Sequence, residues 1–250
     1  MISVVVVGSG NVATHLIQAF SQVDTICLKQ VYTRNLDDLE TFKITIPVTN
    51  SLDLLEEADV TIIAVSDDAI SEVSSQIQNS FVVHTSGNTG MQQLRNSTRK
   101  GVFYPLQSFS KEKPVDFHHI PFCLEVENSK DMAMLEILAN ALGGSIYHIS
   151  SDQRKNIHVA AVFANNFTNH MYQMAKDICD THQIPFDILQ PLIEETADKV
   201  KRLSPKDAQT GPAIRKDEKT IKNHLNLLDS SQKELYKHLT ESIQKHGKKL

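Results

Sequence analysis

Near its start the chain reads Val4-Val5-Val6-Val7-Gly8-Ser9-Gly10-Asn11-Val12-Ala13, and this stretch decides the fold. The β-branched run is typical of a buried strand, and an apolar helical pattern follows the second glycine. Gly8 permits a tight turn, Gly10 lets the backbone approach a pyrophosphate, and the small Ala13 lets the helix pack against the strand. Free amide N–H groups and the positive end of the helix dipole would meet the phosphates there. The stretch therefore predicts a dinucleotide-binding loop.

Composition excludes several other classes of function. The 250 residues fit one or two domains, and a net charge of −5 offers no basic surface for nucleic acid. No run of about 18 apolar residues is present to span a membrane. The cysteines Cys27, Cys123 and Cys179 are scattered and odd in number, which indicates reduced thiols and a cytoplasmic protein. No metal-ligand spacing occurs, so no metal site is expected.

Strand and helix patterns alternate over the first 150 residues. Strands are expected at 26–33, 60–65, 81–84, 101–104, 121–126 and 145–148, with helices at 51–57, 68–77 and 129–142. This alternation predicts an α/β fold, a doubly wound and mostly parallel Rossmann sheet.

The pattern changes after residue 150, where no strand signal remains. Residues 154–183 contain neither Gly nor Pro, which predicts one helix about 45 Å long at 1.5 Å per residue. Further helices are expected at 185–202, 217–228 and 231–246. We therefore expect a nucleotide-binding domain over 1–150 and an all-helical substrate or dimerisation domain over 151–250.

The residues at the end of the second strand should determine whether NAD or NADP binds. An acidic residue there would bind the ribose of NAD, whereas an arginine accommodates the additional phosphate of NADP. The chain places Thr33 and Arg34 at this point, and Arg34 can donate two parallel hydrogen bonds to a phosphate. NADP is therefore favoured over NAD. The alternative is that Arg34 is a surface cation and Asp37 or Asp38 binds the ribose.

Loops after later strands should line the nicotinamide, because open α/β sheets bind ligands at the carboxyl ends of their strands. Val65 and Ser66 follow one buried strand, and Ser66 could equally cap a helix. His84 and Ser86 follow the next strand and offer a titratable ring and a hydroxyl. The alternative for this segment is a polar turn in which His84 bonds to the backbone.

Two further clusters come from the helical half. On an uninterrupted helix His158, Asn165 and Asn169 fall within about 40° of one another, so His158 could move a proton while Asn165 and Asn166 orient a substrate. A solvated helix face is the alternative. Arg215 lies in a turn before Asp217 and is suited to hold an anion, unless it pairs with Asp217 and Asp217 caps the next helix.

Several motifs in sequence order give the chain a family resemblance. After the glycine loop they are His84-Thr85-Ser86-Gly87, Tyr104-Pro105-Leu106-Gln107-Ser108-Phe109, His158-Val159-Ala160-Ala161-Val162-Phe163-Ala164-Asn165-Asn166-Phe167 and Thr210-Gly211-Pro212 with Arg215 and Asp217. The chain resembles Rossmann-like proteins whose second domain was long catalogued as a domain of unknown function (DUF2520). These are relatives of pyrroline-5-carboxylate reductase and of proteins similar to the C-terminal domain of 6-phosphogluconate dehydrogenase.

The resemblance implies an NADP-dependent oxidoreductase with a helical domain that forms a homodimer, and it implies no particular substrate. Two positions depart from the pattern. Lys216 stands where a small residue, usually glycine, is expected. Related hydroxyacid dehydrogenases use a lysine followed four residues later by asparagine, whereas Lys155 is followed by Val159. Their lysine mechanism is therefore not carried over.

These observations lead to one hypothesis and one rival. The hypothesis is hydride transfer between NADP(H) and a small, anionic carbonyl or imine compound bound between the two domains. His158 or His84 would be the proton donor, Asn165 and Asn166 would orient the substrate, and Ser86 with Arg215 would hold its anionic group. The rival is a non-catalytic NADP-binding sensor or assembly protein.

Overall fold

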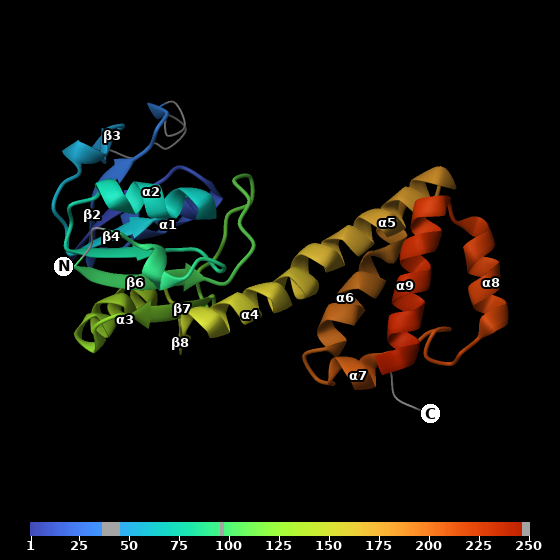
Figure 1. The fold of residues 1–250 in the computed structure, drawn as a ribbon. Helices are drawn as coiled ribbons and strands as arrows, with labels where there is room; N and C mark the ends of the chain where they lie inside the picture. Colours follow the sequence, from blue (N-terminus) through green and yellow to red (C-terminus); the bar gives the residue numbers. More distant parts are fainter. Residues whose placement is uncertain (37–45, 96–97, 247–250) are drawn as a thin grey trace. The chain divides into compact units, whose positions relative to one another are not determined.

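The computed structural model describes residues 1–36, 46–95 and 98–246. Contacts within the chain divide it into two compact units, Met1–Asn165 and Asn166–Leu250. Figure 1 shows the first unit as a sheet flanked by helices and the second as helices alone. The first turns of the long helix thus belong to the sheet unit. The predicted domain boundary near residue 150 stays a prediction.

The first unit contains an eight-stranded sheet within the described residues, in the order β3-β2-β1-β4-β5-β6-β7-β8. The strands are β1 (Ile2–Val7), β2 (Ile26–Tyr32), β3 (Val48–Thr49), β4 (Val60–Ile63), β5 (Phe81–His84), β6 (Arg99–Pro105), β7 (Pro121–Val126) and β8 (Ser145–His148). All neighbours are parallel except β6 and β7. The prediction of a doubly wound, mostly parallel sheet is confirmed.

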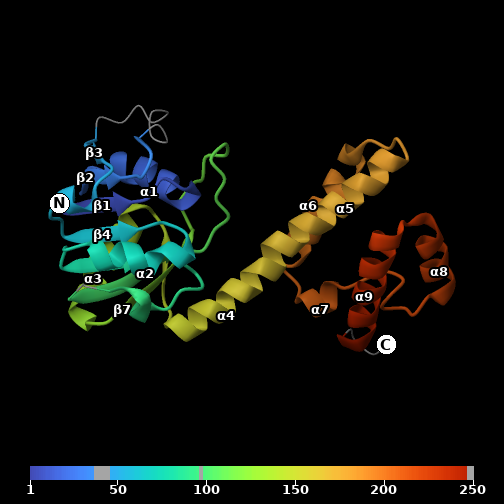
Figure 2. The same ribbon diagram turned by 45° about the horizontal axis from the view of Figure 1, so that its top comes forward.

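Helices cover both faces of this sheet (Figure 2). Helices α1 (Asn11–Ser21) and α3 (Met132–Ala141) share one apolar cluster with Val4 and Val6, and α2 (Asp67–Gln76) shares the other with Val5 and Val7. The four valines are completely buried, because alternate residues of a central strand point to opposite faces. The opening valine run is therefore a strand buried on both sides.

The strand order reverses between β1 and β4, which is the switch point at which open α/β sheets bind ligands. The first six strands follow the order typical of dinucleotide-binding folds. The short β3 was not predicted, and the helix expected at 51–57 is wrong. Only one 3₁₀ turn, Leu52–Leu54, forms there, and its end residue Leu55 has an extended backbone.

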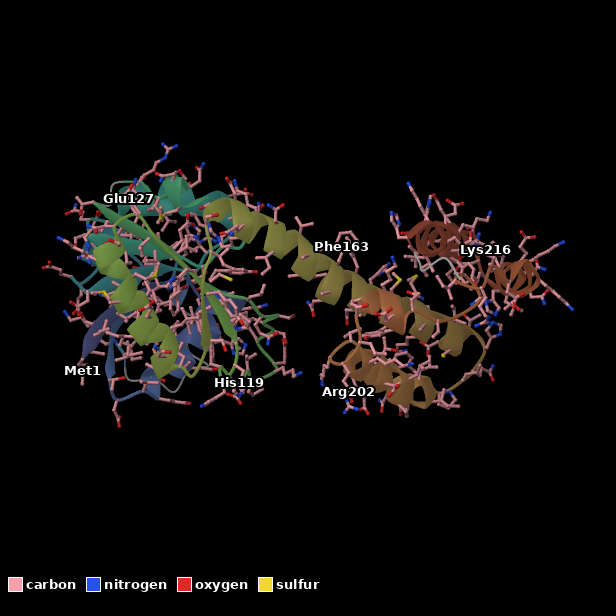
Figure 3. The ribbon with its side chains drawn as sticks, turned by 90° about the horizontal axis from the view of Figure 1, so that it is seen from below. Met1, His119, Glu127, Phe163, Arg202 and Lys216 are labelled. Carbon is pink, nitrogen blue, oxygen red and sulfur yellow. The ribbon has the colours of Figure 1, made fainter. Side chains whose placement is uncertain are left out.

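A long helical run follows β8. It comprises α4 (Ser151–Ala161), a π-helical segment (Val162–Phe167) and α5 (Thr168–Thr181). Ser150 begins it with a capping box, since its hydroxyl accepts from the Gln153 amide and Gln153 bonds back to the Ser150 amide. Phe163, labelled in Figure 3, lies in the π segment. The helix expected over 154–183 is thus continuous but not uniformly α-helical.

The second unit continues with α6 (Gln190–Lys199), α7 (Pro205–Ala208), α8 (Glu218–Leu227) and α9 (Ser230–His246). Among its described residues, the buried apolar ones are Cys179 and Ala213. No helix in the described ranges has both the length and the apolar character that crossing a membrane requires.

Candidate functional site

A cavity of about 730 Å³ lies at the carboxyl ends of the central strands of the first unit. Its walls combine the loops after β1, β4 and β5 with the end of β2, helix α2 and three residues from elsewhere, Leu52, Lys111 and His158. The lining residues are Gly8, Ser9, Gly10, Asn11, Val12, Tyr32, Arg34, Leu52, Ala64, Val65, Ser66, Asp67, Ala69, Glu72, Val73, Gln76, Thr85, Ser86, Gly87, Lys111 and His158. The cavity therefore unites most of the predicted cofactor-binding residues with His158.

The two glycines of the first loop have different structural roles. Gly8 has a φ of 134°, and a Cβ there would lie 2.3 Å from the carbonyl oxygen of Ala64, so only glycine fits. Gly10 has an ordinary φ of −73°, and a Cβ there would meet nothing within 4 Å. Its missing side chain leaves open space beside the start of α1, as the approach of a pyrophosphate requires. Ala13 is buried behind this loop and lines no part of the cavity.

Only one of the two residues predicted to bind a phosphate at the end of β2 reaches the cavity. Arg34 is exposed and lines the wall. Thr33 is almost completely buried, with Oγ1 3.0 Å from Ser9 Oγ and 3.0 Å from the Asn35 carbonyl oxygen. Thr33 therefore braces the glycine loop instead of facing a ligand. The alternative ribose ligands, Asp37 and Asp38, lie outside the described residues.

The loop after β4 supplies Val65 and Ser66 to the cavity wall, as predicted from its place at a strand end. Ser66 is also the N-cap residue of α2, but its side chain makes no capping hydrogen bond. The alternative role of Ser66 as a side-chain cap is therefore not seen.

The loop after β5 separates its two predicted site residues. Ser86 lines the cavity, and its hydroxyl oxygen accepts from the backbone N–H groups of Asn88 (3.1 Å) and Thr89 (2.8 Å). His84 is completely buried and lines no part of the cavity. Its Nδ1 accepts from the Ser86 backbone N–H at 3.1 Å, which is the polar-turn alternative.

His84 is held in its neutral form. Burial, followed by the positive charge of Arg154, lowers its pKa to about 3. Its Nε2 is buried and has no hydrogen-bond partner among the described residues. A ring that stays neutral and lies behind the cavity wall is poorly placed to donate a proton to a substrate.

A buried arginine fixes the loop after β5. Arg154 of α4 is completely buried and donates to the carbonyl oxygens of Ser86 (3.1 Å) and Thr89 (2.6 Å). Its Nη1 also lies 2.5 Å from Glu125 Oε2, which accepts from Ser151 Oγ at 2.7 Å. The start of α4 is thus tied to the cavity wall by an ion pair and several hydrogen bonds. Sequence reasoning missed this cluster, because nothing in a solvated helical pattern marks Arg154 as buried.

His158 lines the cavity one helical turn beyond Arg154, and its ring lies beside Tyr104 of β6. The hydroxyl oxygen of Tyr104 is 3.3 Å from His158 Nδ1, and the two rings meet edge to face. Burial is the main cause that raises the pKa of Tyr104 to about 12. The hydroxyl therefore keeps its proton near neutral pH and can donate to a neutral imidazole or accept from a charged one.

Gly87 permits this arrangement. A Cβ at Gly87 would lie 2.6 Å from His158 Nδ1 and 2.8 Å from Tyr104 Cζ. Tyr104 and Gly87 entered the sequence argument only within family motifs. Neither position could be linked to His158 without the fold.

Besides Ala13, Thr33 and His84, three further predicted site residues do not line the cavity. Asn165 and Asn166 are exposed within the π-helical segment, which breaks the even 100° spacing on which the expected polar stripe rests. Arg215 is exposed in the second unit. Asp217 beside it caps α8 by accepting from the Thr220 backbone N–H at 3.1 Å. No group of three metal-ligating side chains occurs among the described residues.

Comparison with known families divides the chain in two. Residues 3–86 match the family described as NADP oxidoreductase coenzyme F420-dependent. Residues 120–243 match the domain of unknown function DUF2520. No curated protein is significantly similar to this chain.

Solved structures resemble the chain over its whole length. A Bacteroides fragilis protein provisionally described as an NADP oxidoreductase is 39% identical to this chain. The match covers 98% of each chain and has a TM-score of 0.90. A pyrroline-5-carboxylate reductase from Streptococcus pyogenes is 13% identical over 98% of each chain, with a TM-score of 0.65. An imine reductase from Myxococcus stipitatus, solved with NADP+, is 16% identical over 97% of this chain and 92% of its own, with a TM-score of 0.63. The last two show the fold alone.

Proposed function

Because the chain belongs to the NADP oxidoreductase family represented by the Bacteroides fragilis protein, with DUF2520 as its second domain, we propose that it transfers hydride between NADP(H) and a small carbonyl or imine compound. The observation that carries this proposal is the single cavity lined both by the glycine loop and by His158. NADP(H) supplies the hydride when it is bound. The chain must bind it, position the substrate and move one proton.

Binding is assigned to the residues nearest the switch point. The backbone at Gly10 and Asn11 begins α1 and offers N–H groups to the pyrophosphate. Arg34 at the end of β2 supplies a cation for the additional phosphate that distinguishes NADP from NAD. The open space at Gly10 fits the pyrophosphate.

Proton transfer is assigned to His158. Its Nδ1 is engaged by Tyr104, so Nε2 is the nitrogen left to exchange a proton with the substrate. Tyr104 can reverse the direction of its hydrogen bond when His158 changes charge, which keeps the ring in place in both states. Ser86 retains its hydroxyl proton for a substrate oxygen or nitrogen, since its oxygen accepts both of its hydrogen bonds, from the backbone N–H groups of Asn88 and Thr89.

The substrate-binding roles of Asn165, Asn166 and Arg215 remain proposals, as does a substrate position between the two domains. The cytoplasmic location also stays a prediction. Cyclic imines and small keto acids are the compounds to test first, because the family resemblance favours small carbonyl and imine acceptors.

Loss of NADPH absorbance with a panel of cyclic imines and keto acids tests the activity. We expect one class of acceptor to oxidise NADPH, and His158→Ala to lower kcat by about 10²–10⁴-fold while NADPH still binds. His148→Ala is the matched control, since His148 only pairs with Glu136 on the surface. NADPH binding with no turnover across the panel would favour the sensor alternative.

We also propose that the protein is a homodimer formed through its helical domain. The second unit exposes Ile188, Leu192 and Leu227, each with more than three-fifths of its surface accessible at 69%, 63% and 70%. Such apolar exposure, with so little buried apolar surface in the same unit, is typical of a protein that buries these side chains against a partner.

A further inference from the structure

A short segment before Lys111 is fastened to the helix that follows the glycine loop. The side-chain amide of Asn11 donates to the Phe109 carbonyl oxygen at 2.9 Å. His15 Nε2 lies 3.0 Å from the Ser110 carbonyl oxygen, and because a carbonyl only accepts, this nitrogen carries the proton. The Phe109 ring packs 5.2 Å from the His15 ring and 6.0 Å from Phe117. The backbone leading to Lys111 is therefore held by α1, and the Phe109 ring also packs near Phe117.

Lys111 itself lines the same cavity as Gly10 and Asn11. It is exposed and makes no ion pair with any described side chain. The first turn of α1 contains no acidic residue. A lysine held near the positive end of a helix, with no carboxylate in that turn, is in an unfavourable place unless an anion joins it.

Resting on the proposed function, we propose that Lys111 binds the pyrophosphate of the dinucleotide and forms a second, cationic side to the glycine loop. The glycine loop contributes neutral N–H groups from one side of the cavity, and Lys111 contributes a charge from a segment about 100 residues away. Asn11 and His15 act as positioning residues, because they hold the backbone that carries Lys111.

This assignment differs from that of Arg34 in a measurable way. The pyrophosphate is common to NADPH and NADH, whereas the phosphate assigned to Arg34 is present in NADPH alone. Loss of the Lys111 charge should therefore weaken both cofactors by the same factor. Loss of the Arg34 charge should weaken NADPH and leave NADH nearly unchanged.

Dissociation constants of NADPH and NADH, measured by calorimetry without substrate, test this proposal. We expect Lys111→Gln to raise both constants about tenfold, the scale of one charge-assisted hydrogen bond. Its effect should shrink as ionic strength rises. Arg34→Gln should raise the NADPH constant alone. Lys113→Gln is the matched control, because Lys113 lies on the same segment, is exposed and lines no part of the cavity.

Each other outcome overturns the proposal. Unchanged constants for both cofactors in Lys111→Gln would show that Lys111 contacts neither. A change for NADPH alone would move Lys111 to the additional phosphate. Because binding is measured without turnover, an inactive protein still gives an answer. Wild-type protein that binds neither cofactor would contradict the proposed function itself.

Discussion

Gly87 and His158 are so close that a single methyl group cannot be placed between them: a Cβ on Gly87 would lie 2.6 Å from His158 Nδ1. Real Cβ atoms do not approach a ring nitrogen so closely, so the imidazole or the loop must move. The same Cβ would also lie 2.8 Å from Tyr104 Cζ. The pair that we assign to proton transfer therefore depends on the absence of a side chain at position 87.

Gly87→Ala should separate binding from turnover. We expect kcat to fall at least tenfold, because a displacement of about 1 Å at a reacting group can cost 10²-fold, while the NADPH dissociation constant changes little. Steady-state kinetics and calorimetry on the same preparation measure the two quantities. Gly90→Ala is the control, since a Cβ there would come no closer than 4.0 Å to Ser151 Oγ. Equal losses in both variants would argue against the role of the Gly87 contact.

The two glycines of the first loop predict opposite outcomes. Gly8→Ala places a Cβ 2.3 Å from the Ala64 carbonyl oxygen at a φ of 134°, so we expect a loss of stability of several kcal/mol, on the order of 3 or more. Gly10→Ala meets nothing within 4 Å and keeps an ordinary backbone. We expect Gly10→Ala to fold normally but to bind NADPH at least tenfold more weakly. Urea unfolding and NADPH titration test both variants, and tight binding by Gly10→Ala would contradict our placement of the pyrophosphate.

His84 predicts an acid dependence of stability. Its pKa is about 3 in the folded chain and 6.5 in the unfolded one, so the unfolded chain binds the additional proton between these values. The free energy of unfolding has its full His84 contribution above about pH 6.5. As the pH falls from there towards 3, this contribution decreases by about 1.4 kcal/mol per pH unit. Urea unfolding of wild type and His84→Gln at pH 7 and pH 5 isolates this contribution. Between pH 7 and pH 5 the wild type should lose more unfolding free energy than the variant. Equal losses in the two proteins would contradict the assigned role of His84.

The buried pair of Arg154 and Glu125 should be far more important for stability than pairs on the surface. Arg154→Met leaves the Glu125 carboxylate without its cation and removes the donors to Ser86 and Thr89. Breaking a buried pair in this way costs about 3–5 kcal/mol of unfolding free energy. Lys201→Met breaks the exposed pair with Asp198 and should cost about 1 kcal/mol or less. Comparable losses in the two variants, measured by denaturant unfolding, would contradict the structural role of Arg154.

The fold and half of the site could be predicted because their signals are local. The valine run, the glycine loop and Arg34 all follow from what stands next to a strand end. Two contacts between residues distant in sequence could not be predicted. β6 places Tyr104 beside His158, and the hydrogen bond from the Asn11 side-chain amide to the Phe109 carbonyl oxygen holds the segment that carries Lys111. Burial of His84 is equally invisible in a polar turn. The π-helical segment has no marker, because Val162–Phe167 lacks both Gly and Pro.

One departure from the family pattern has a backbone explanation. Lys216, where a small residue was expected, has a φ of 54°, in the left-handed region that favours glycine. Glycine is thus expected at this position because the backbone there is left-handed. Lysine keeps that conformation in this chain, within the turn that leads to the cap of α8.

The exposed apolar residues of the second unit give the last prediction. Leu192 lies on α6 with 63% of its surface accessible, and a charge there should disfavour a partner packed against it. We expect wild type to be dimeric in light scattering after gel filtration, and Leu192→Glu to shift towards the monomer with a lower melting temperature that depends on protein concentration. Ile137→Glu is the matched control, because Ile137 is a similarly exposed residue at 50% on helix α3 of the first unit. A wild type that stays monomeric at all concentrations would contradict the dimer.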